Sequence, residues 1–293
     1  MDNPQLKDLF AKGKKPILYE INPPKGVVFS TIDTILDSLR GRVDVYLVPE
    51  YPSANMRIDP IFLASYLENK GESTIYEISS AHRNAISFQG CILGAYTLGL
   101  KTILLSNGIH PKFGDHPQAK DVSDLDMDGM VDAILAMREG RDLMGHEMEG
   151  KIDVYVGVRV HYRTITEEAM VLELKKIESW IEKGISFFIT PIVFYDKHYI
   201  PFAKKVRGMG GKVIPSITLL KSAGMARFIN KHLEGVEVPD SFINEILRAP
   251  DKVKTACEIA KKVWDSIGED GDGLMIVPYG WDMKVPLLLD YLS

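Results

Sequence analysis

The sequence predicts a single α/β domain over residues 1–293 that folds as a closed (β/α)8 barrel of the TIM type. Eight short apolar runs rich in β-branched residues occur along the chain, and amphipathic helical segments separate them. No linker-like stretch interrupts this alternation. The length also suits one barrel, because barrels commonly run to about 250 residues as a single unit.

The expected strands are apolar at consecutive positions, which is typical of a parallel sheet covered by helices on both faces. In chain order they are Ile17–Asn22, Val43–Val48, Thr74–Ser79, Thr102–Ser106, Val154–Val160, Ser186–Thr190, Lys212–Ile217 and Gly273–Pro278. Eight such units favour a closed barrel over an open doubly wound sheet. The turn after the first strand, Asn22-Pro23-Pro24-Lys25-Gly26, also lacks the glycine-rich dinucleotide fingerprint of a Rossmann sheet.

Helices are expected between the strands, where apolar residues recur at helical spacing. The clearest segments are Asp59–Asn69, Ala85–Leu98, Asp128–Gly140, Glu167–Lys183, Ile200–Met209 and Lys252–Ile267.

Composition and charge exclude several classes of function. The chain is 45% hydrophobic, and its net charge of −5 makes it a poor candidate for bulk nucleic-acid binding. Cys91 and Cys257 lie far apart and form no CxxC pair, so neither a disulfide framework nor a zinc motif is expected. The apolar run Cys91–Leu100 is too short to cross a bilayer, and Met1–Lys15 has no secretion-signal core. We therefore expect a cytoplasmic protein with no membrane partner.

If the barrel forms, function is expected where the strands end and the loops begin. Polar residues gather at those ends: Glu20, Asn22, Glu50, Tyr51, Glu77, His82, Arg83, Asn107, His110, Asp115, His116, Arg159, His161 and Tyr162. The sixth strand ends instead in the apolar patch Pro191-Ile192-Val193. Such a mouth, polar with one apolar wall, suits a flat heteroaromatic ligand.

Glu20 is the sharpest candidate for catalysis. It lies in the apolar run Ile17-Leu18-Tyr19-Glu20-Ile21, where strand alternation aims it into the barrel mouth. A partly buried carboxyl there would have a raised pKa and could act as a general acid near neutral pH. The alternative is a structural acid paired with a cation across the barrel, such as Arg159.

Other candidates carry weaker signals. His110 and His116, with Asp115 between them, lack further ligands at metal-binding spacing, so a solvated loop is favoured over a metal site. Arg83 precedes the helix expected from Ala85, where free N–H groups suit an anion, although a helix cap with solvated charges explains the same residues. No Gly-x-Ser-x-Gly elbow or phosphate-binding loop is present, which disfavours triad hydrolases and nucleotide kinases.

Several motifs resemble the methylenetetrahydrofolate reductase family, in order and over nearly the whole chain. They are Tyr19-Glu20-Ile21-Asn22-Pro23-Pro24-Lys25, Gly114-Asp115-His116-Pro117-Gln118-Ala119-Lys120, Arg138-Glu139-Gly140-Arg141-Asp142-Leu143, Val213-Ile214-Pro215-Ser216-Ile217 and Val236-Glu237-Val238-Pro239-Asp240. The resemblance implies an eight-stranded barrel whose mouth holds a flavin, FAD or FMN. That flavin takes hydride from NAD(P)H and passes it to methylenetetrahydrofolate. Glu20 matches the family's strand-one glutamate, the general acid that opens the folate's five-membered ring.

Several family residues that contact flavin or folate are replaced here. Pro49 stands where the family has the Thr that ends strand two, and Glu77 stands where it has a His or Gln on strand three. Ile109 and Ser123 stand in place of the Asp and the aromatic residue of the fourth loop. Trp180 replaces the Lys that binds the flavin phosphates, and Pro191 or Ile192 replaces the folate-binding Gln. Each loss removes a contact worth about 1–3 kcal/mol. The resemblance therefore implies a flavin site with an altered cradle.

Three functions remain open at this stage. The first is a divergent reductase that converts 5,10-methylene-tetrahydropterin to the 5-methyl form, with a repositioned flavin or with hydride taken directly from a nicotinamide. The second is a pterin-linked methyl-transfer enzyme, and the third is a non-catalytic folate-binding subunit of a redox complex. We adopt the first as the hypothesis.

In that hypothesis the site residues beside the acid Glu20 have assigned parts. Glu77 and Asn107 contact the pterin or cofactor, Arg83 and His110 contact anionic groups, His161 and Tyr162 line the cofactor side, and Asp115 is a further binding residue. The expected partners are a tetrahydrofolate-type pterin and NAD(P)H, together with either a second copy of the chain or a redox partner subunit.

Overall fold

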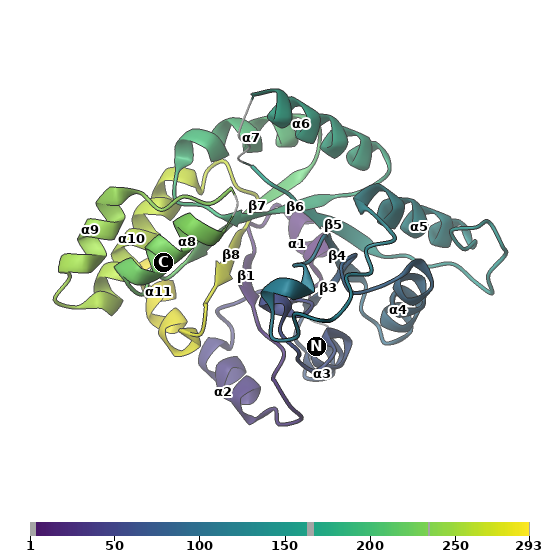
Figure 1. Ribbon diagram of the computed structural model, residues 1–293, viewed down its shortest axis with the longest axis horizontal. Coiled ribbons are helices and arrows are strands. Elements are labelled where there is room, and N and C mark those ends of the chain that lie inside the picture. Colours follow the sequence, from purple (N-terminus) through teal and green to yellow (C-terminus); the bar gives the residue numbers. More distant parts are fainter. Residues whose placement is uncertain (1–3, 163–166, 234, 293) are drawn as a thin grey trace.

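A computed structural model describes residues 4–162, 167–233 and 235–292, and its eight parallel strands close into one barrel in chain order (Figure 1). The strands are β1 Ile17–Glu20, β2 Val45–Val48, β3 Thr74–Ser79, β4 Thr102–Ser106, β5 Tyr155–Arg159, β6 Phe187–Ile192, β7 Lys212–Thr218 and β8 Leu274–Val277. Each strand lies within two residues of its predicted bounds at both ends. The predicted (β/α)8 barrel is therefore confirmed.

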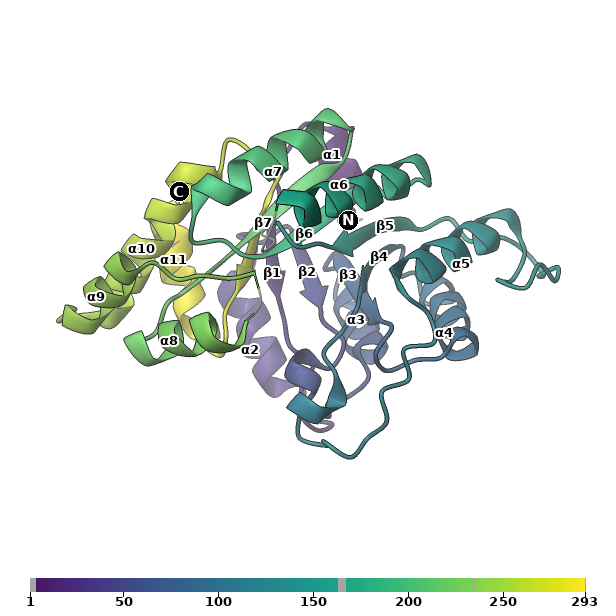
Figure 2. The same cartoon turned by 45° about the horizontal axis from the view of Figure 1, so that its top comes forward.

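Helices surround this barrel (Figure 2). They are α1 Leu6–Ala11, α2 Ser30–Leu39, α3 Pro60–Asn69, α4 Ala85–Thr97, α5 Met127–Glu139, α6 Glu167–Glu182, α7 Asp196–Gly208, α8 Ala223–His232, α9 Asp240–Arg248, α10 Lys252–Ile267 and α11 Val285–Leu292. The predicted segments correspond to α3, α4, α5, α6, α7 and α10, and α7 begins before the predicted Ile200. No helix in the described part of the chain is long and apolar enough to span a membrane.

Local signals explain where several helices begin and end. The side chains of Asp59, Asn84 and Asp126 each accept a hydrogen bond from a backbone N–H in the first turn of the helix that follows. Helix α5 ends at Gly140, whose φ of 85° is left-handed and favours glycine. These caps fix where the loops after β2, β3 and β4 end and where α3, α4 and α5 begin.

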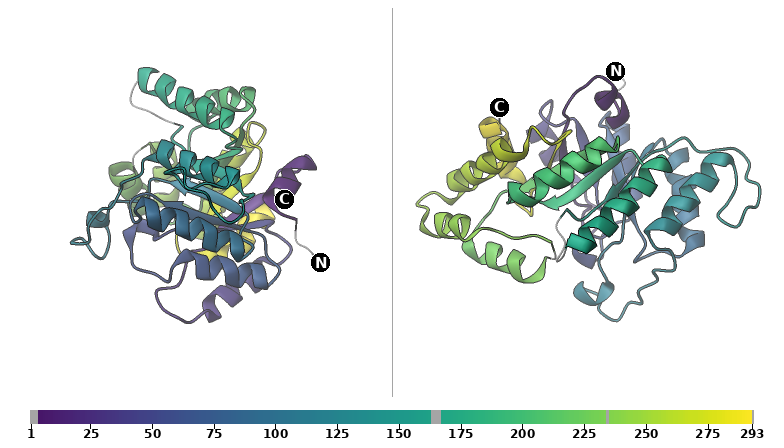
Figure 3. Two further views of the ribbon diagram at one scale, coloured as in Figure 1. Left: turned by 90° about the vertical axis from the view of Figure 1, so that its right-hand side faces the viewer. Right: turned by 90° about the horizontal axis from the view of Figure 1, so that it is seen from above.

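Near the amino ends of the strands, the barrel interior is an apolar core closed by α1. Leu6 and Leu9 of α1 belong to the same buried cluster as Leu18 and Ile75 of the strands. Figure 3 shows α1 at the opposite end of the barrel from the loop between β4 and α5. The α1 end is thus plugged, which leaves the carboxyl ends of the strands as the open end.

Gly157 makes room for a large ring inside the barrel. A Cβ at this position would lie 2.4 Å from the Phe187 ring, which stacks on Tyr155 with centroids 5.4 Å apart. A side chain larger than hydrogen would therefore collide with the core.

The inward-facing layer above this core is charged. In such a barrel each layer comes from alternate strands, and here the odd strands contribute Glu20, Glu77, Arg159 and Ser216. Each of these four residues is in register with a fully buried apolar residue of the next even-numbered strand. The buried partners, in the same order, are Leu47, Leu104, Ile189 and Met275. Three charged side chains thus rest on an apolar floor at the open end.

Candidate functional site

A cavity of about 580 Å³ opens at the carboxyl ends of the strands. Every strand or the residue just after it contributes to its lining, through Glu20, Pro49, Glu77, Ser106, Arg159, Thr190, Ser216 and Val277. Cavities of this size hold small organic ligands, and this end of the fold is where barrel enzymes place their active sites.

At the floor of the cavity, Arg159 is held between two carboxylates. Its Nε and Nη2 donate to Glu77 Oε1 and Oε2 at 2.9 and 2.8 Å, which is a bidentate pair. The same Nη2 donates to Glu20 Oε2 at 3.0 Å. The side chains of Glu20 and Glu77 are only 12% and 7% exposed. The arrangement contains two acids and one cation, so one negative charge is left unbalanced.

This environment raises the pKa of Glu20 above its ordinary value. Burial is the largest cause, Arg159 opposes it, and the charge of Glu77 adds to it. The Glu20 carboxyl therefore combines a feature of each interpretation from the sequence, because it lines the cavity and also pairs with Arg159.

Strained backbone gathers around the cavity. Tyr51, Ser53 and Tyr279 line it and have φ values of 40°, 58° and 45°, a region that side chains other than glycine rarely adopt. Strain of this kind persists where the surrounding structure enforces it, and it clusters at functional sites. Burial raises the pKa of Tyr279 to about 12, and the negative charge of Glu20 contributes. The Tyr279 phenol therefore stays neutral beside the acid.

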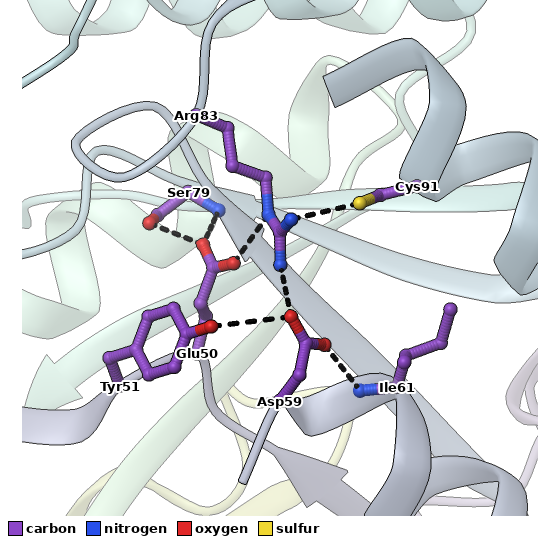
Figure 4. A network of polar contacts seen from close by, with 7 residues as sticks. All are labelled: Glu50, Tyr51, Asp59, Ile61, Ser79, Arg83 and Cys91. Carbon is purple, nitrogen blue, oxygen red and sulfur yellow. Dashed lines mark hydrogen bonds and ion pairs between the residues drawn. The ribbon is translucent and has the colours of Figure 1, made fainter. Parts of the chain in front are cut away.

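A second arginine, Arg83, belongs to a polar network with Glu50, which follows β2, and Ser79 at the end of β3 (Figure 4). Arg83 Nε donates to Glu50 Oε1 at 2.6 Å, while the backbone N–H and the hydroxyl of Ser79 both donate to Glu50 Oε2 at 2.6 Å. The Glu50 side chain is fully buried, so these donors replace water on both of its oxygens. This network joins the ends of β2 and β3.

The same guanidinium reaches the first turn of α3. Arg83 Nη2 donates to Asp59 Oδ2 at 2.7 Å, and Nη1 lies 2.8 Å from Cys91 Sγ on α4 (Figure 4). Asp59 Oδ2 also accepts from the Tyr51 hydroxyl at 3.2 Å. Arg83 thus holds the strained Tyr51 loop against two helices.

The opposite side of the cavity is apolar. Ile192 at the end of β6 lies there as predicted, and helix α8 adds Met225, Phe228 and Ile229. Phe228 is 59% exposed on this wall. A planar ligand could lie against this wall with its polar edge toward the acids.

The structure brings together half of the predicted site residues. Glu20, Glu77, Asn107 and His161 all line the cavity. Arg159, predicted at the barrel mouth and as a partner for Glu20, also lines the cavity. Tyr279 and α8 were missed, because neither carries a motif of its own.

The other predicted residues lie outside the cavity lining. Arg83 is engaged by buried acceptors, so its guanidinium is already committed within the scaffold. Tyr162 is 2% exposed, and its hydroxyl donates to the Ile192 carbonyl. His110 Nδ1 accepts from the Lys112 N–H in an exposed turn.

Asp115 connects three loops at the rim. It accepts from Lys25 Nζ at 2.5 Å and from the Met56 N–H at 2.9 Å, and it contacts His116 Nδ1. These partners hold the pKa of Asp115 well below its usual range, Lys25 being the largest cause. Within the described ranges, no cluster of three or more histidine, cysteine or acidic residues is arranged to hold a metal ion.

A family model described as methylenetetrahydrofolate reductase matches residues 5–265. The chain belongs to the methylenetetrahydrofolate reductase family. A search of curated protein sequences finds no match.

Solved structures share the fold at low identity. An uncharacterized protein from Clostridium thermocellum that binds two copies of 5-methyl-5,6,7,8-tetrahydrofolic acid is 16% identical, with a TM-score of 0.63 over 98% of this chain and 97% of that one. A riboflavin lyase, solved with modified FMN and riboflavin, is 9% identical, with a TM-score of 0.56 over 95% and 90% of the two chains. Tryptophan synthase from M. tuberculosis is also 9% identical, with a TM-score of 0.56 over 98% and 94%.

The family implies a flavin, and the positions that correspond to the family's flavin contacts do not supply its donors here, although Lys221 lines the cavity at another position. The Trp180 indole Nε1 donates to Asp128 at 2.6 Å and is 4% exposed between α6 and α5, so this position supplies no cation for a flavin phosphate. Pro49, Ile109 and Pro191 line the cavity without side-chain donors. Arg159, the guanidinium of the cavity floor, already serves two carboxylates. We therefore derive no step through a bound flavin.

Proposed function

We propose that this protein reduces a 5,10-methylene-tetrahydropterin to its 5-methyl form, with Glu20 as the general acid. Membership of the family supports the reaction class, and the observation that carries the proposal is the Glu20 carboxyl at the cavity floor, held by Arg159 through one oxygen. The hydride donor is a reduced nicotinamide dinucleotide that enters as a second substrate. A substrate that leaves at each turnover needs much less binding free energy than a resident cofactor.

The proton is delivered by Glu20. Its Oε2 is held by Arg159, and within the described residues no hydrogen bond engages Oε1. Transfer of the proton to N10 of the substrate breaks the bond between N10 and the bridging carbon and leaves an iminium at N5. Hydride then adds to that carbon, the nicotinamide is oxidised, and Glu20 recovers its proton from water.

The other cavity residues orient the pterin. In this proposal the Asn107 amide meets the polar edge of the ring, while Phe228 and Ile192 cover its apolar face.

The test is Glu20→Gln, which keeps an oxygen that can accept from Arg159 but carries no proton to deliver. General acid catalysis contributes about 10²–10⁴-fold, so we expect turnover to fall at least about a hundredfold. Turnover is followed by NADH oxidation and by mass detection of the 5-methyl product. Binding of the 5-methyl pterin, measured by calorimetry, should be retained. Glu178→Gln, an exposed change on α6, is the matched control, and unchanged turnover in Glu20→Gln would refute the assignment.

A non-catalytic pterin-binding module is the second candidate. The observation that favours it is the ion pair of Glu20 with Arg159, which would suffice as a structural role for the acid. The related Clostridium thermocellum fold, which binds a methylated tetrahydrofolate, is consistent with binding alone. Tight pterin binding by the unmodified protein, with no product from any nicotinamide, would select this candidate.

A further inference from the structure

We propose that Glu77 is a positioning residue for the general acid: by holding Arg159 in two parallel hydrogen bonds, it keeps that guanidinium from neutralising Glu20. The inference rests on the proposed function, because it concerns how Glu20 keeps a proton to donate. It assigns separate parts to two glutamates that line the same cavity.

The geometry around Arg159 is unequal. Glu77 receives two hydrogen bonds from separate nitrogens, at 2.9 and 2.8 Å, whereas Glu20 receives one at 3.0 Å from a nitrogen it shares with Glu77. Bidentate arginine–carboxylate pairs are stronger than single charge-assisted bonds. Glu77 therefore takes most of the stabilisation that the cation offers.

The charge balance then selects the protonated partner. Two carboxylates that share one cation in a low-dielectric site do not both remain ionised easily. The proton goes to the less stabilised carboxylate, which is Glu20. Glu20 Oε1 is the oxygen left to carry that proton toward a ligand.

Within the described residues, the charges that act most on Glu20 are those of Arg159 on β5 and Glu77 on β3. Lys221 and His161 line the same cavity, the phenol of Tyr279 after β8 faces Glu20, and Tyr19 is its neighbour along β1. Burial raises the pKa of both phenols, so they remain neutral over the working range.

The first experiment uses the unmodified protein. Carbon-13 labelling of glutamate carboxyls lets each group be titrated by NMR, and the Glu20 signal is identified by its loss in Glu20→Gln. We expect Glu20 to take up its proton above the ordinary glutamate pKa of 4.5. A Glu20 titration at or below that value overturns the proposal, and this measurement requires no change at Glu77.

The second experiment is Glu77→Gln, which keeps an acceptor for Arg159 but removes the competing charge. Arg159 then serves Glu20 as its one anionic partner, so the Glu20 titration should move to lower pH. Turnover requires protonated Glu20, so its decline with rising pH should begin earlier. At neutral pH we expect about a tenfold loss, recovered on acidification. Glu178→Gln, the exposed control on α6, should leave the Glu20 titration and the pH profile unchanged.

The outcomes separate this inference from the proposed function. An unmoved Glu20 titration in Glu77→Gln overturns the role of Glu77, whatever the activity. A shifted titration in a protein that reduces no pterin overturns the proposed reaction and leaves the control of Glu20 by Glu77 standing.

Discussion

The buried Arg83 network allows a sharp test of what burial does to an ion pair. Arg83→Gln removes the cation from Glu50, whose side chain is fully buried, and from the first-turn acceptor Asp59. Removing one partner of a buried pair leaves an uncompensated charge and costs about 3–5 kcal/mol. The matched control is Arg40→Gln, because Arg40 and Asp37 also lie 2.6 Å apart but are 77% and 68% exposed. That change should cost less than about 1 kcal/mol.

The assay is urea unfolding followed by circular dichroism, at neutral pH and again near the ordinary glutamate pKa of 4.5. Burial raises the pKa of Glu50 and Arg83 lowers it, so the pKa rises further in the variant. When the pKa of a carboxyl is higher in the folded than in the unfolded state, the free energy of unfolding falls as the pH rises through the folded-state pKa. The deficit of Arg83→Gln should therefore be largest at neutral pH and shrink on acidification. Equal costs for the two arginine variants, or a deficit that does not depend on pH, would refute this reasoning.

Two further predictions concern the core and the cofactor. Gly157→Ala should lower the free energy of unfolding by about 3 kcal/mol, because its Cβ meets the Phe187 ring; Gly90→Ala on α4 meets nothing within 4 Å and should stabilise by up to about 1 kcal/mol. Similar urea midpoints for the two variants would contradict the crowding at Gly157. Purified protein should show no visible absorbance band of bound flavin, before or after excess FAD or FMN is added. A retained band after gel filtration would restore the flavin mechanism.

The barrel could be predicted from sequence because its strands carry a local signal. Runs such as Thr74–Ser79 and Thr102–Ser106 are short, rich in apolar residues and buried throughout, and their bounds in the structure are the predicted ones. Helix α8 was not among the predicted helices, although Ala223, Ala226 and Ile229 recur at helical spacing on its buried face. The apolar wall that it adds to the cavity was therefore not foreseen.

The same reason separates the site residues whose direction could be predicted from those whose direction could not. Inside a strand, alternation of side chains fixes the direction of Glu20 and Glu77, and both were correctly placed at the mouth. Beyond a strand, direction depends on the path of the loop. Tyr162 follows β5 by three residues, and its ring turns into the core against Tyr199. Arg83 follows β3, but its acceptors come from β2 and α3, which no local pattern in the sequence brings together.

Comparison of the two arginine sites explains why one is scaffold and the other is a candidate for chemistry. Burial raises the pKa of both Glu50 and Glu20, so a raised pKa does not by itself identify a general acid. Both oxygens of Glu50 are engaged, one by Arg83 and the other by Ser79, which leaves no oxygen to exchange a proton with a ligand. Arg159 engages one oxygen of Glu20, and the other borders a cavity large enough for a pterin. A protonatable carboxyl becomes an acid catalyst when its geometry leaves an oxygen for the substrate, and among these two glutamates that condition is met at Glu20.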